Sequence, residues 1–403
     1  MCTTPRSFPT SGFEVLDPSV PVEEETLPTY HAEKYYPVHI GEVLDNRYQV
    51  VAKIGFGVTS TVWLGRDLNE SRYVVLKVYV TGTERNHELE VYARINATQT
   101  THLGKTCIRK LLGHFHIDGP HGRHVCLVHQ PLGLSLHDYL FFLPGRVMGF
   151  ESLKACLRQL IATLDFLHTE ARVIHTDLQL KNLLLPGNDT YLSRAEEAEL
   201  DSPTPRKIVD NGDHPRSIHI SQIIIPGNGL PLLSDLGECR FLDQDNHGEI
   251  MPNPYRAPEV IFKMPWDEKV DIWNVGVLAW DIVSTRCLFQ GWNADDIFDD
   301  RVHVAEMVAL LGPPPQDFVS RSPVGHVFWH ENSTWKDLAP IPEDRTLESL
   351  GAGLKGDGDM EGLYRFLRKA LQWRAEDRPT ARELLTDAWL LEGLGLPSKS
   401  QEA

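Results

Sequence analysis

Two stretches of the chain decide its fold: His175-Thr176-Asp177-Leu178-Gln179-Leu180-Lys181-Asn182 and, further on, Asp235-Leu236-Gly237. In the first stretch, Asp177 can accept a proton and Asn182 can hold a metal ion. In the second, Asp235 offers a metal-binding carboxylate in a turn that Gly237 keeps tight. This order of acid, amide and acid is what phosphoryl transfer from Mg-ATP needs. The two stretches therefore predict an ATP-dependent phosphotransferase.

A glycine hairpin upstream points to the same chemistry. It joins two predicted strands, and its glycines allow backbone N–H groups to lie close to a triphosphate. A short glycine pattern in a hairpin is more often an ordinary turn, but this one precedes a strand that carries a lysine. We expect ATP contacts along this hairpin, at Ile54, Gly55, Phe56, Gly57, Val58, Thr59, Ser60, Thr61 and Val62.

The lysine of that strand is Lys77, which lies within the apolar run Val74–Val80. Burying an ammonium group without a counter-charge is costly, so a carboxylate partner is expected. The predicted helix that follows offers Glu88 or Glu90, and the spacing to Ile95 favours Glu88. The alternative, a lysine at a strand edge that reaches solvent, stays open from Lys77 alone.

The overall composition sets limits on the class of protein. The chain has 403 residues, of which 41% are hydrophobic and 24% charged, as in ordinary globular proteins. No apolar run is long enough for a membrane span, and no secretory signal is visible. The six cysteines are scattered, which is typical of reduced thiols in an intracellular protein. A net charge of −17 argues against direct nucleic-acid binding and suits a basic partner, although it could serve solubility alone.

The order of the predicted elements indicates an α+β fold with two lobes. Short strands rich in Val and Tyr come first, and long helical periodicities follow beyond Pro131. We expect a disordered N-terminal arm over 1–35, a β-rich N-lobe over 36–132, an α-helical C-lobe over 133–392 and a polar tail over 393–403. A flexible spacer over about 187–230 interrupts the C-lobe, because it combines an acidic run with Ser-Pro, Thr-Pro and several Gly.

The motifs resemble those of a eukaryotic protein kinase from about Tyr36 to Leu391. Finer details are similar to the serine/arginine-rich protein kinases of the CMGC group, in which Thr176 and Leu236 replace the commoner Arg and Phe. The other stretches that carry the resemblance are Tyr36-Pro37-Val38-His39-Ile40-Gly41, Ser60-Thr61-Val62-Trp63-Leu64, Tyr255-Arg256-Ala257-Pro258-Glu259 and Asp271-Ile272-Trp273.

The resemblance implies a bilobal serine/threonine kinase that uses ATP and Mg²⁺ and phosphorylates Ser in Arg/Ser-rich proteins. It implies a monomer in the cytoplasm, the nucleus or both, with no direct nucleic-acid or membrane partner. The implied catalytic residues are Lys77, Glu88 and Asp177, the metal ligands Asn182 and Asp235, and further ATP contacts Gln130 and Leu132. The implied structural residues are Gly237, Asp271, Glu259 and its ion-pair partner Arg378, and the implied substrate-docking acids are Asp295, Asp296, Asp299 and Asp300.

Two departures from the family pattern leave rival functions open. Gln179 stands where serine/threonine kinases place a lysine near the γ-phosphate, and Lys181 is two positions on. Asn253 replaces an arginine found in the family's Arg-x-Tyr-Arg segment, which leaves the exact substrate preference open. The first departure favours a pseudokinase scaffold that binds nucleotide or a partner without efficient catalysis. A small-molecule kinase of the same fold is a further alternative, against which the Ala-Pro-Glu segment argues.

Overall fold

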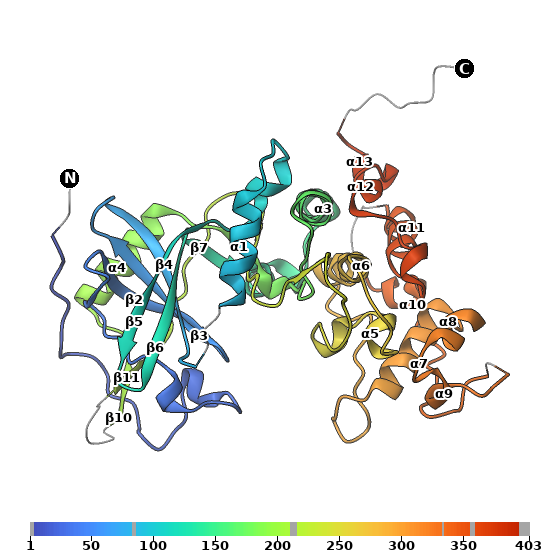
Figure 1. The fold of residues 1–403 in the computed structure, drawn as a ribbon, viewed down its shortest axis with the longest axis horizontal. Coiled ribbons are helices and arrows are strands. Elements are labelled where there is room, and N and C mark those ends of the chain that lie inside the picture. The colour runs from blue at the N-terminus through green and yellow to red at the C-terminus, as the bar shows by residue number, and fades with distance from the viewer. Residues whose placement is uncertain (1–3, 83–85, 210–215, 333, 355–358, 395–403) are drawn as a thin grey trace. The chain divides into compact units, whose positions relative to one another are not determined.

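The computed structural model of the chain describes residues 4–82, 86–209, 216–332, 334–354 and 359–394. The chain divides into two compact units. The first contains the residues up to Asn86 together with 109–134 and 184–229, and the second contains 87–108, 135–183 and the residues from 230 onward. The first unit is built on an antiparallel sheet and the second on helices, which confirms the predicted α+β class (Figure 1).

A six-stranded sheet forms the frame of the first unit, in the order β1-β2-β3-β4-β6-β5. Every neighbouring pair in it is antiparallel. Its strands are β1 (Val43–Leu44), β2 (Tyr48–Gly57), β3 (Ser60–Asp67), β4 (Arg72–Tyr79), β5 (Leu111–Gly119) and β6 (Gly122–His129). The glycine hairpin is the β2–β3 connection, in which Gly57 pairs with Ser60. The register places Lys77 between Val62 on β3 and Leu127 on β6.

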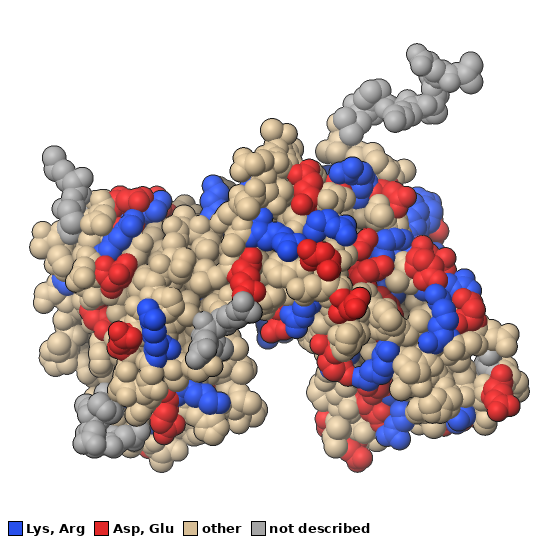
Figure 2. Space-filling view, in the orientation of Figure 1, with Lys and Arg blue, Asp and Glu red and all other residues tan. Residues whose placement is uncertain are grey.

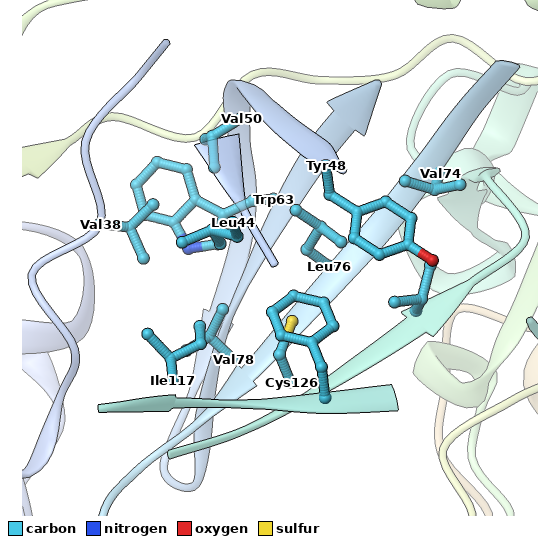
Figure 3. Close-up of a cluster of buried hydrophobic side chains, with 12 residues drawn as sticks. Val38, Leu44, Tyr48, Val50, Trp63, Val74, Leu76, Val78, Ile117 and Cys126 are labelled. Carbon is cyan, nitrogen blue, oxygen red and sulfur yellow. The ribbon is translucent and has the colours of Figure 1, made fainter. Parts of the chain in front are cut away.

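The alternation of side chains along β4 explains where its lysine points. Val74, Leu76 and Val78 enter a buried cluster on one face of the sheet, as Figure 3 shows. Successive side chains of a strand point to opposite faces, so Lys77 lies on the face away from this cluster. The remaining buried members of the cluster are Val38, Leu44, Tyr48, Val50, Trp63, Phe115, Ile117, Cys126 and Val128.

The N-terminal segment and the inserted segment pack on the sheet of the first unit. The N-terminal segment forms the short 3-10 turns η1 (Glu23–Thr26) and η2 (Ala32–Lys34). The insertion forms helix α4 (Asp189–Asp201) and the antiparallel hairpin of β10 (Arg206–Val209) and β11 (Arg216–His219). Phe8, Leu192 and Ile224 join a second buried cluster with residues of β2 and β3. The described residues of these two segments are therefore folded, whereas the sequence predicts a disordered arm over 1–35 and a flexible spacer over about 187–230.

Two glutamates of the acidic run are buried and have polar or ionic partners, which explains this difference. Glu196 and Glu199 are each 1% exposed. The Tyr73 hydroxyl donates to Glu196 at 2.5 Å, and the Arg206 guanidinium donates to Glu199 at 3.1 Å. Lys207 donates to Glu25 of the N-terminal segment at 2.8 Å. The composition of this acidic run predicts that it is solvated. In the structure it is folded, because groups from distant parts of the chain pair with its carboxylates.

Helices make up most of the second unit. α6 is buried along almost its whole length, as its apolar sequence predicts, and no helix among the described residues is long and apolar enough to span a bilayer. The helices are α1 (His87–Ala97), α2 (Leu136–Leu140), α3 (Phe150–Phe166), α5 (Pro258–Ile261), α6 (Lys269–Val283), α7 (Asp300–Leu311), α8 (Gln316–Arg321), α9 (Gly325–Phe328), α10 (Leu347–Gly351), α11 (Met360–Ala370), α12 (Ala381–Leu384) and α13 (Ala388–Leu391).

Short elements complete the chain. They are β7 (Leu132–Ser135), β8 (Val173–Ile174), β9 (Leu183–Pro186), β12 (Leu232–Leu233), β13 (Arg240–Phe241), and the turns η3 (Leu103–Cys107), η4 (Pro144–Arg146), η5 (Leu167–Ala171), η6 (Leu180–Asn182), η7 (Asn253–Tyr255) and η8 (Ala375–Asp377). The predicted polar tail over 393–403 lies outside the described residues except for its first two positions.

Candidate active site

The loop that carries Asp177 is held by a carboxylate of the buried helix α6. β8 leads into this loop and pairs with β13. The Asp271 carboxylate accepts the backbone N–H groups of His175 at 2.8 Å and Thr176 at 2.9 Å, and it also accepts from His168 at 2.8 Å. Thr176 has a φ of 64°, a left-handed conformation that costs energy for a β-branched residue. Asp271 therefore holds a strained backbone immediately before Asp177.

Two side-chain amides orient the Asp177 carboxylate. Asn182 donates from Nδ2 to Asp177 Oδ2 at 2.8 Å, and Gln179 donates from Nε2 to Asp177 Oδ1 at 2.9 Å. Burial raises the pKa of Asp177, and the nearby charge of Asp235 raises it further, while the two amide donors lower it. Each carboxylate oxygen keeps a lone pair for another donor, so the group can still accept a substrate hydroxyl.

Ser234 connects this loop with the Asp235 turn. Its N–H and its hydroxyl both donate to the carbonyl of Asn182, each at 2.9 Å. Thr176 adds a second connection, because its hydroxyl donates to the Glu238 carbonyl at 2.6 Å. The carboxylate of Asp235, the residue after Ser234, is exposed. The structure thus brings Asp177, Asn182 and Asp235 together within the second unit.

These residues fit a magnesium ion held together with phosphates. Asn182 uses its amide nitrogen on Asp177, which leaves its amide oxygen for a cation. The repulsion between Asp177 and Asp235 is of the kind that a cation relieves. Among the described residues no group of three or more His, Cys, Asp or Glu could hold a metal by itself. Magnesium sites of phosphotransferases need only one or two protein ligands besides the phosphates, so this donor set is sufficient.

The expected ion pair between Glu259 and Arg378 is present and buried. Arg378 Nη1 and Nη2 donate to the two Glu259 oxygens at 2.6 and 2.7 Å. The Arg378 side chain is 0% exposed, and the same guanidinium donates to the carbonyls of Lys269 and Gln372. Through Arg378 the pair links α5 with the N-terminal end of α6.

The remaining predicted catalytic and nucleotide-binding residues lie in the two units as follows. In the first unit, Lys77 is 9% exposed, and a Cβ added to Gly57 would meet no heavy atom within 4 Å. The peptide N–H of Gln130 donates to Lys110, and Leu132 is buried at the start of β7. In the second unit, Glu88 on α1 is 2% exposed. Glu90, the other candidate partner of Lys77, is exposed and lies 3.8 Å from His87.

The four predicted docking acids differ in their surroundings. Asp295 and Asp296 are exposed on the loop before α7. Asp299 caps α7 by accepting the Arg301 N–H at 2.8 Å, and its hydrogen bonds from the Arg301 side chain lower the pKa of the carboxyl. Asp300 lies 3.8 Å from Arg256. Two of the four carboxylates therefore already have partners within the chain.

Sequence reasoning missed the positioning role of Gln179 and of Thr176. From the sequence, Gln179 indicates only that the usual lysine is absent, whereas in the structure its amide donates to the Asp177 carboxylate. Its position two residues after Asp177 was a usable signal, because side chains two apart in an extended loop point to the same side. No sequence signal indicated that the Thr176 hydroxyl would reach Glu238, which lies far along the chain.

Comparison with known proteins defines the class. The model of the protein kinase domain matches residues 48–212 and 216–390, and the chain belongs to the protein kinase family. A serine/threonine protein kinase of Aspergillus fumigatus is 40% identical over 392 residues, which cover 96% of this chain and 95% of the relative. The chain is a serine/threonine protein kinase, and its catalysis depends on ATP.

Further relatives confirm the resemblance to the serine/arginine-rich protein kinases. The serine/threonine-protein kinase SRPK of Physarum polycephalum is 28% identical over 92% of both chains. The SRSF protein kinase 3 of Mus musculus is 34% identical over 176 residues, which are 43% of this chain and 31% of that protein.

Proposed function

We propose that this kinase transfers the γ-phosphoryl group of Mg-ATP to Ser in Arg/Ser-rich proteins. The observation that carries the catalytic part is the Asp177 carboxylate, oriented by Asn182 and Gln179 beside Asp235. The names of the SRPK and SRSF kinase relatives support the substrate class, and the net charge of −17 is compatible with a basic partner. A monomer that acts in the cytoplasm, the nucleus or both completes the proposal.

Each side chain has a definite task in this proposal. Asp177 accepts the hydrogen of the substrate hydroxyl and aligns its oxygen for in-line attack. Asn182 and Asp235 hold magnesium, and Lys77, paired with Glu88, binds the α- and β-phosphates. The backbone of residues 54–62 covers the phosphates, and Gln130 and Leu132 line the base. When bound, Mg-ATP supplies the phosphoryl group and the cations that offset its charge.

The test of this function is labelling of peptides with radioactive ATP. We expect phosphate transfer to an Arg/Ser-repeat peptide and much less to a Lys/Ser-repeat peptide of equal charge, because Arg forms bidentate contacts with carboxylates. Asp177→Ala is the control for contaminating kinases. Equal labelling by this variant would exclude the mechanism, and equal labelling of both peptides would exclude the Arg preference.

Substitutions of Gln179 test whether this chain has a working replacement for the usual lysine. Gln179→Ala removes a donor from the reacting carboxylate, and we expect kcat to fall by roughly 3–10-fold. Gln179→Lys keeps a donor in reach and adds positive charge near the transferred phosphate, so kcat should match or exceed that of the wild type. The measurement is steady-state kinetics at saturating ATP.

The matched control for Gln179 is its exposed neighbour Lys181. Lys181→Ala should leave kcat within about twofold, the usual range for an exposed surface change. A large loss in Lys181→Ala together with full activity in Gln179→Ala would show that Lys181 performs the task, and would contradict the role given to Gln179.

The exposed acids before α7 should contribute to peptide affinity. On the face of the second unit that Figure 2 shows, acidic and basic side chains are mixed, so a local acidic loop is the better docking candidate than the whole face. Asp295→Asn with Asp296→Asn should raise KM for the Arg/Ser peptide about 2–30-fold, since two exposed ion pairs contribute about 0.2–1 kcal/mol each. The kinetic constant kcat should stay unchanged.

A control of equal charge change is available in the same unit. Glu343 and Asp344 are also exposed, and Glu343→Gln with Asp344→Asn should leave KM unchanged. A similar rise of KM in both double variants would mean that net charge, not docking at the loop, is responsible. Asp299 is unsuitable for this test because its substitution also removes the cap of α7.

A further inference from the structure

The hydroxyl of Tyr35 lies at the tip of the glycine hairpin. It is placed to donate to the carbonyl oxygens of Gly57 at 3.1 Å and Val58 at 3.0 Å. A hydroxyl has a single hydrogen, so the two carbonyls share this donor. Tyr35 is 3% exposed, so the packing around its ring fixes the direction in which the hydroxyl points. The N-terminal segment therefore contacts the part of the kinase that is proposed to cover the phosphates.

The hairpin tip has a turn that its own sequence does not favour. Val58 and Thr59 form a two-residue connection between Gly57 and Ser60, which pair with each other. Such short connections prefer turns with positive φ, for which Gly, Asn and Asp are suited. Neither Val58 nor Thr59 is among the described residues with positive φ, and both are β-branched. The hydrogen bond from Tyr35 should therefore stabilise this turn more than it would stabilise a Gly-rich turn.

The contact with Tyr35 also fixes the direction of the loop N–H groups. In a planar trans peptide the C=O and the next N–H point in opposite directions. Holding the carbonyls of Gly57 and Val58 towards Tyr35 therefore turns the N–H groups of Val58 and Thr59 away from it. The space next to Gly57 is open, so a phosphate can approach this part of the turn.

The insertion holds Tyr35 in place. Arg216 of β11 donates to the carbonyl of Tyr35 at 2.5 Å and to that of Ala32 at 2.6 Å, and it donates to the Tyr30 hydroxyl at 3.2 Å. The rings of Tyr30 and Tyr35 lie with their centroids 5.2 Å apart. A single guanidinium thus connects the hairpin of the insertion with the residues that carry the Tyr35 ring.

A buried ion-pair group anchors the other end of the same segment. Lys53 of β2 is 0% exposed at its side chain, pairs with Glu24, and lies 3.4 Å from Glu23. Glu23 in turn accepts from the Ser221 hydroxyl of the insertion at 2.6 Å. Residues 23–35, which we name the strap, are therefore attached to both β2 and the insertion.

We propose that the strap positions the glycine hairpin for phosphate binding, with Tyr35 as the positioning residue and Arg216 as its anchor. This inference rests on the proposed role of residues 54–62 in covering the phosphates. It gives the insertion and the N-terminal segment a joint task in the reaction. The strap does not touch the reacting atoms, so its effect should appear in ATP affinity and loop mobility.

Tyr35→Phe in the full chain removes only the hydroxyl. We expect amide hydrogen exchange in residues 54–62 to become roughly 2–10-fold faster without nucleotide, the range for loss of one hydrogen bond. KM for ATP should rise by a similar factor, with kcat and the melting temperature little changed. Arg216→Lys keeps the charge but replaces the planar fork, whose two Nη groups reach Tyr35 and Ala32 separately, with one compact ammonium group. It should therefore shift both quantities in the same direction.

Tyr36→Phe is the matched control, because the Tyr36 hydroxyl faces Glu42 instead of the loop. It should leave exchange and KM for ATP as in the wild type. Unchanged exchange in Tyr35→Phe, or faster exchange with unchanged KM, would overturn the positioning role. If the wild type itself failed to bind ATP, the proposed function would be wrong, and the exchange comparison would still decide whether Tyr35 restrains the hairpin.

Discussion

Replacing Asp177 with Asn should lower kcat by about 10²–10⁴-fold, the contribution expected of a positioned proton acceptor. The variant keeps the size of the side chain but loses the negative charge and turns one accepting oxygen into a donor. Gln179 or Asn182 then faces a donor where it now faces an acceptor. The decrease should appear equally in kcat and kcat/KM, because the lost interaction belongs to the transition state.

The measurement pairs steady-state kinetics with direct nucleotide binding. ATP should bind to Asp177→Asn with an affinity within about an order of magnitude of the wild type, since Lys77 and the glycine hairpin are unaltered. Asp344→Asn, an exposed substitution of the same type, should have no effect. Retention of more than half of kcat in Asp177→Asn would exclude Asp177 as the catalytic acceptor.

Glu259→Ala should destabilise the second unit by about 3–5 kcal/mol, the cost of leaving a buried charge without its partner. The Arg378 guanidinium would keep the carbonyls of Lys269 and Gln372 but would lose both carboxylate bonds. Arg378→Ala should lower the stability by a similar amount, because it leaves the buried Glu259 carboxylate without its partner. Chemical denaturation followed by tryptophan fluorescence measures both, since Trp273 lies 5.2 Å from the guanidinium.

An exposed pair provides the control for this prediction. Arg368 and Glu348 also form an ion pair in the second unit, but their side chains are 48% and 56% exposed. Arg368→Ala should cost less than about 1 kcal/mol. The double variant Glu259→Leu with Arg378→Met should recover much of the stability, because it removes both buried charges at once. A small loss in Glu259→Ala would mean that water or another group replaces the carboxylate.

The parts of the fold that depend on local pattern were predictable from the sequence. The apolar run Val74–Val80 predicted a buried strand around Lys77, and the apolar run of α6 predicted a buried helix. The loop from His175 to Asn182 was also predictable, because its chemistry lies within a few residues. These features need no knowledge of distant parts of the chain.

The N-terminal segment and the insertion could not be predicted in this way. Phe8, Leu192 and Ile224 have no common period, and they meet only because β2 and β3 provide the surface between them. The acidic run around Glu196 looked solvated because its partners, such as Tyr73, lie far away in sequence. Composition shows that such a segment has little apolar surface to bury, but it does not show which distant groups will pair with its charged side chains.

The buried Lys53 has a practical consequence for anyone who prepares or inhibits this kinase. The match to the protein kinase domain model begins at residue 48, and a protein shortened to that boundary would lose Glu23 and Glu24 while keeping the ammonium group that they neutralise. An uncompensated charge of this kind inside a sheet is expensive. The smallest independently folding kinase should therefore include the residues from Phe8 onward. Inhibitor screens on a shorter protein would use a glycine hairpin that has lost its contact with the strap.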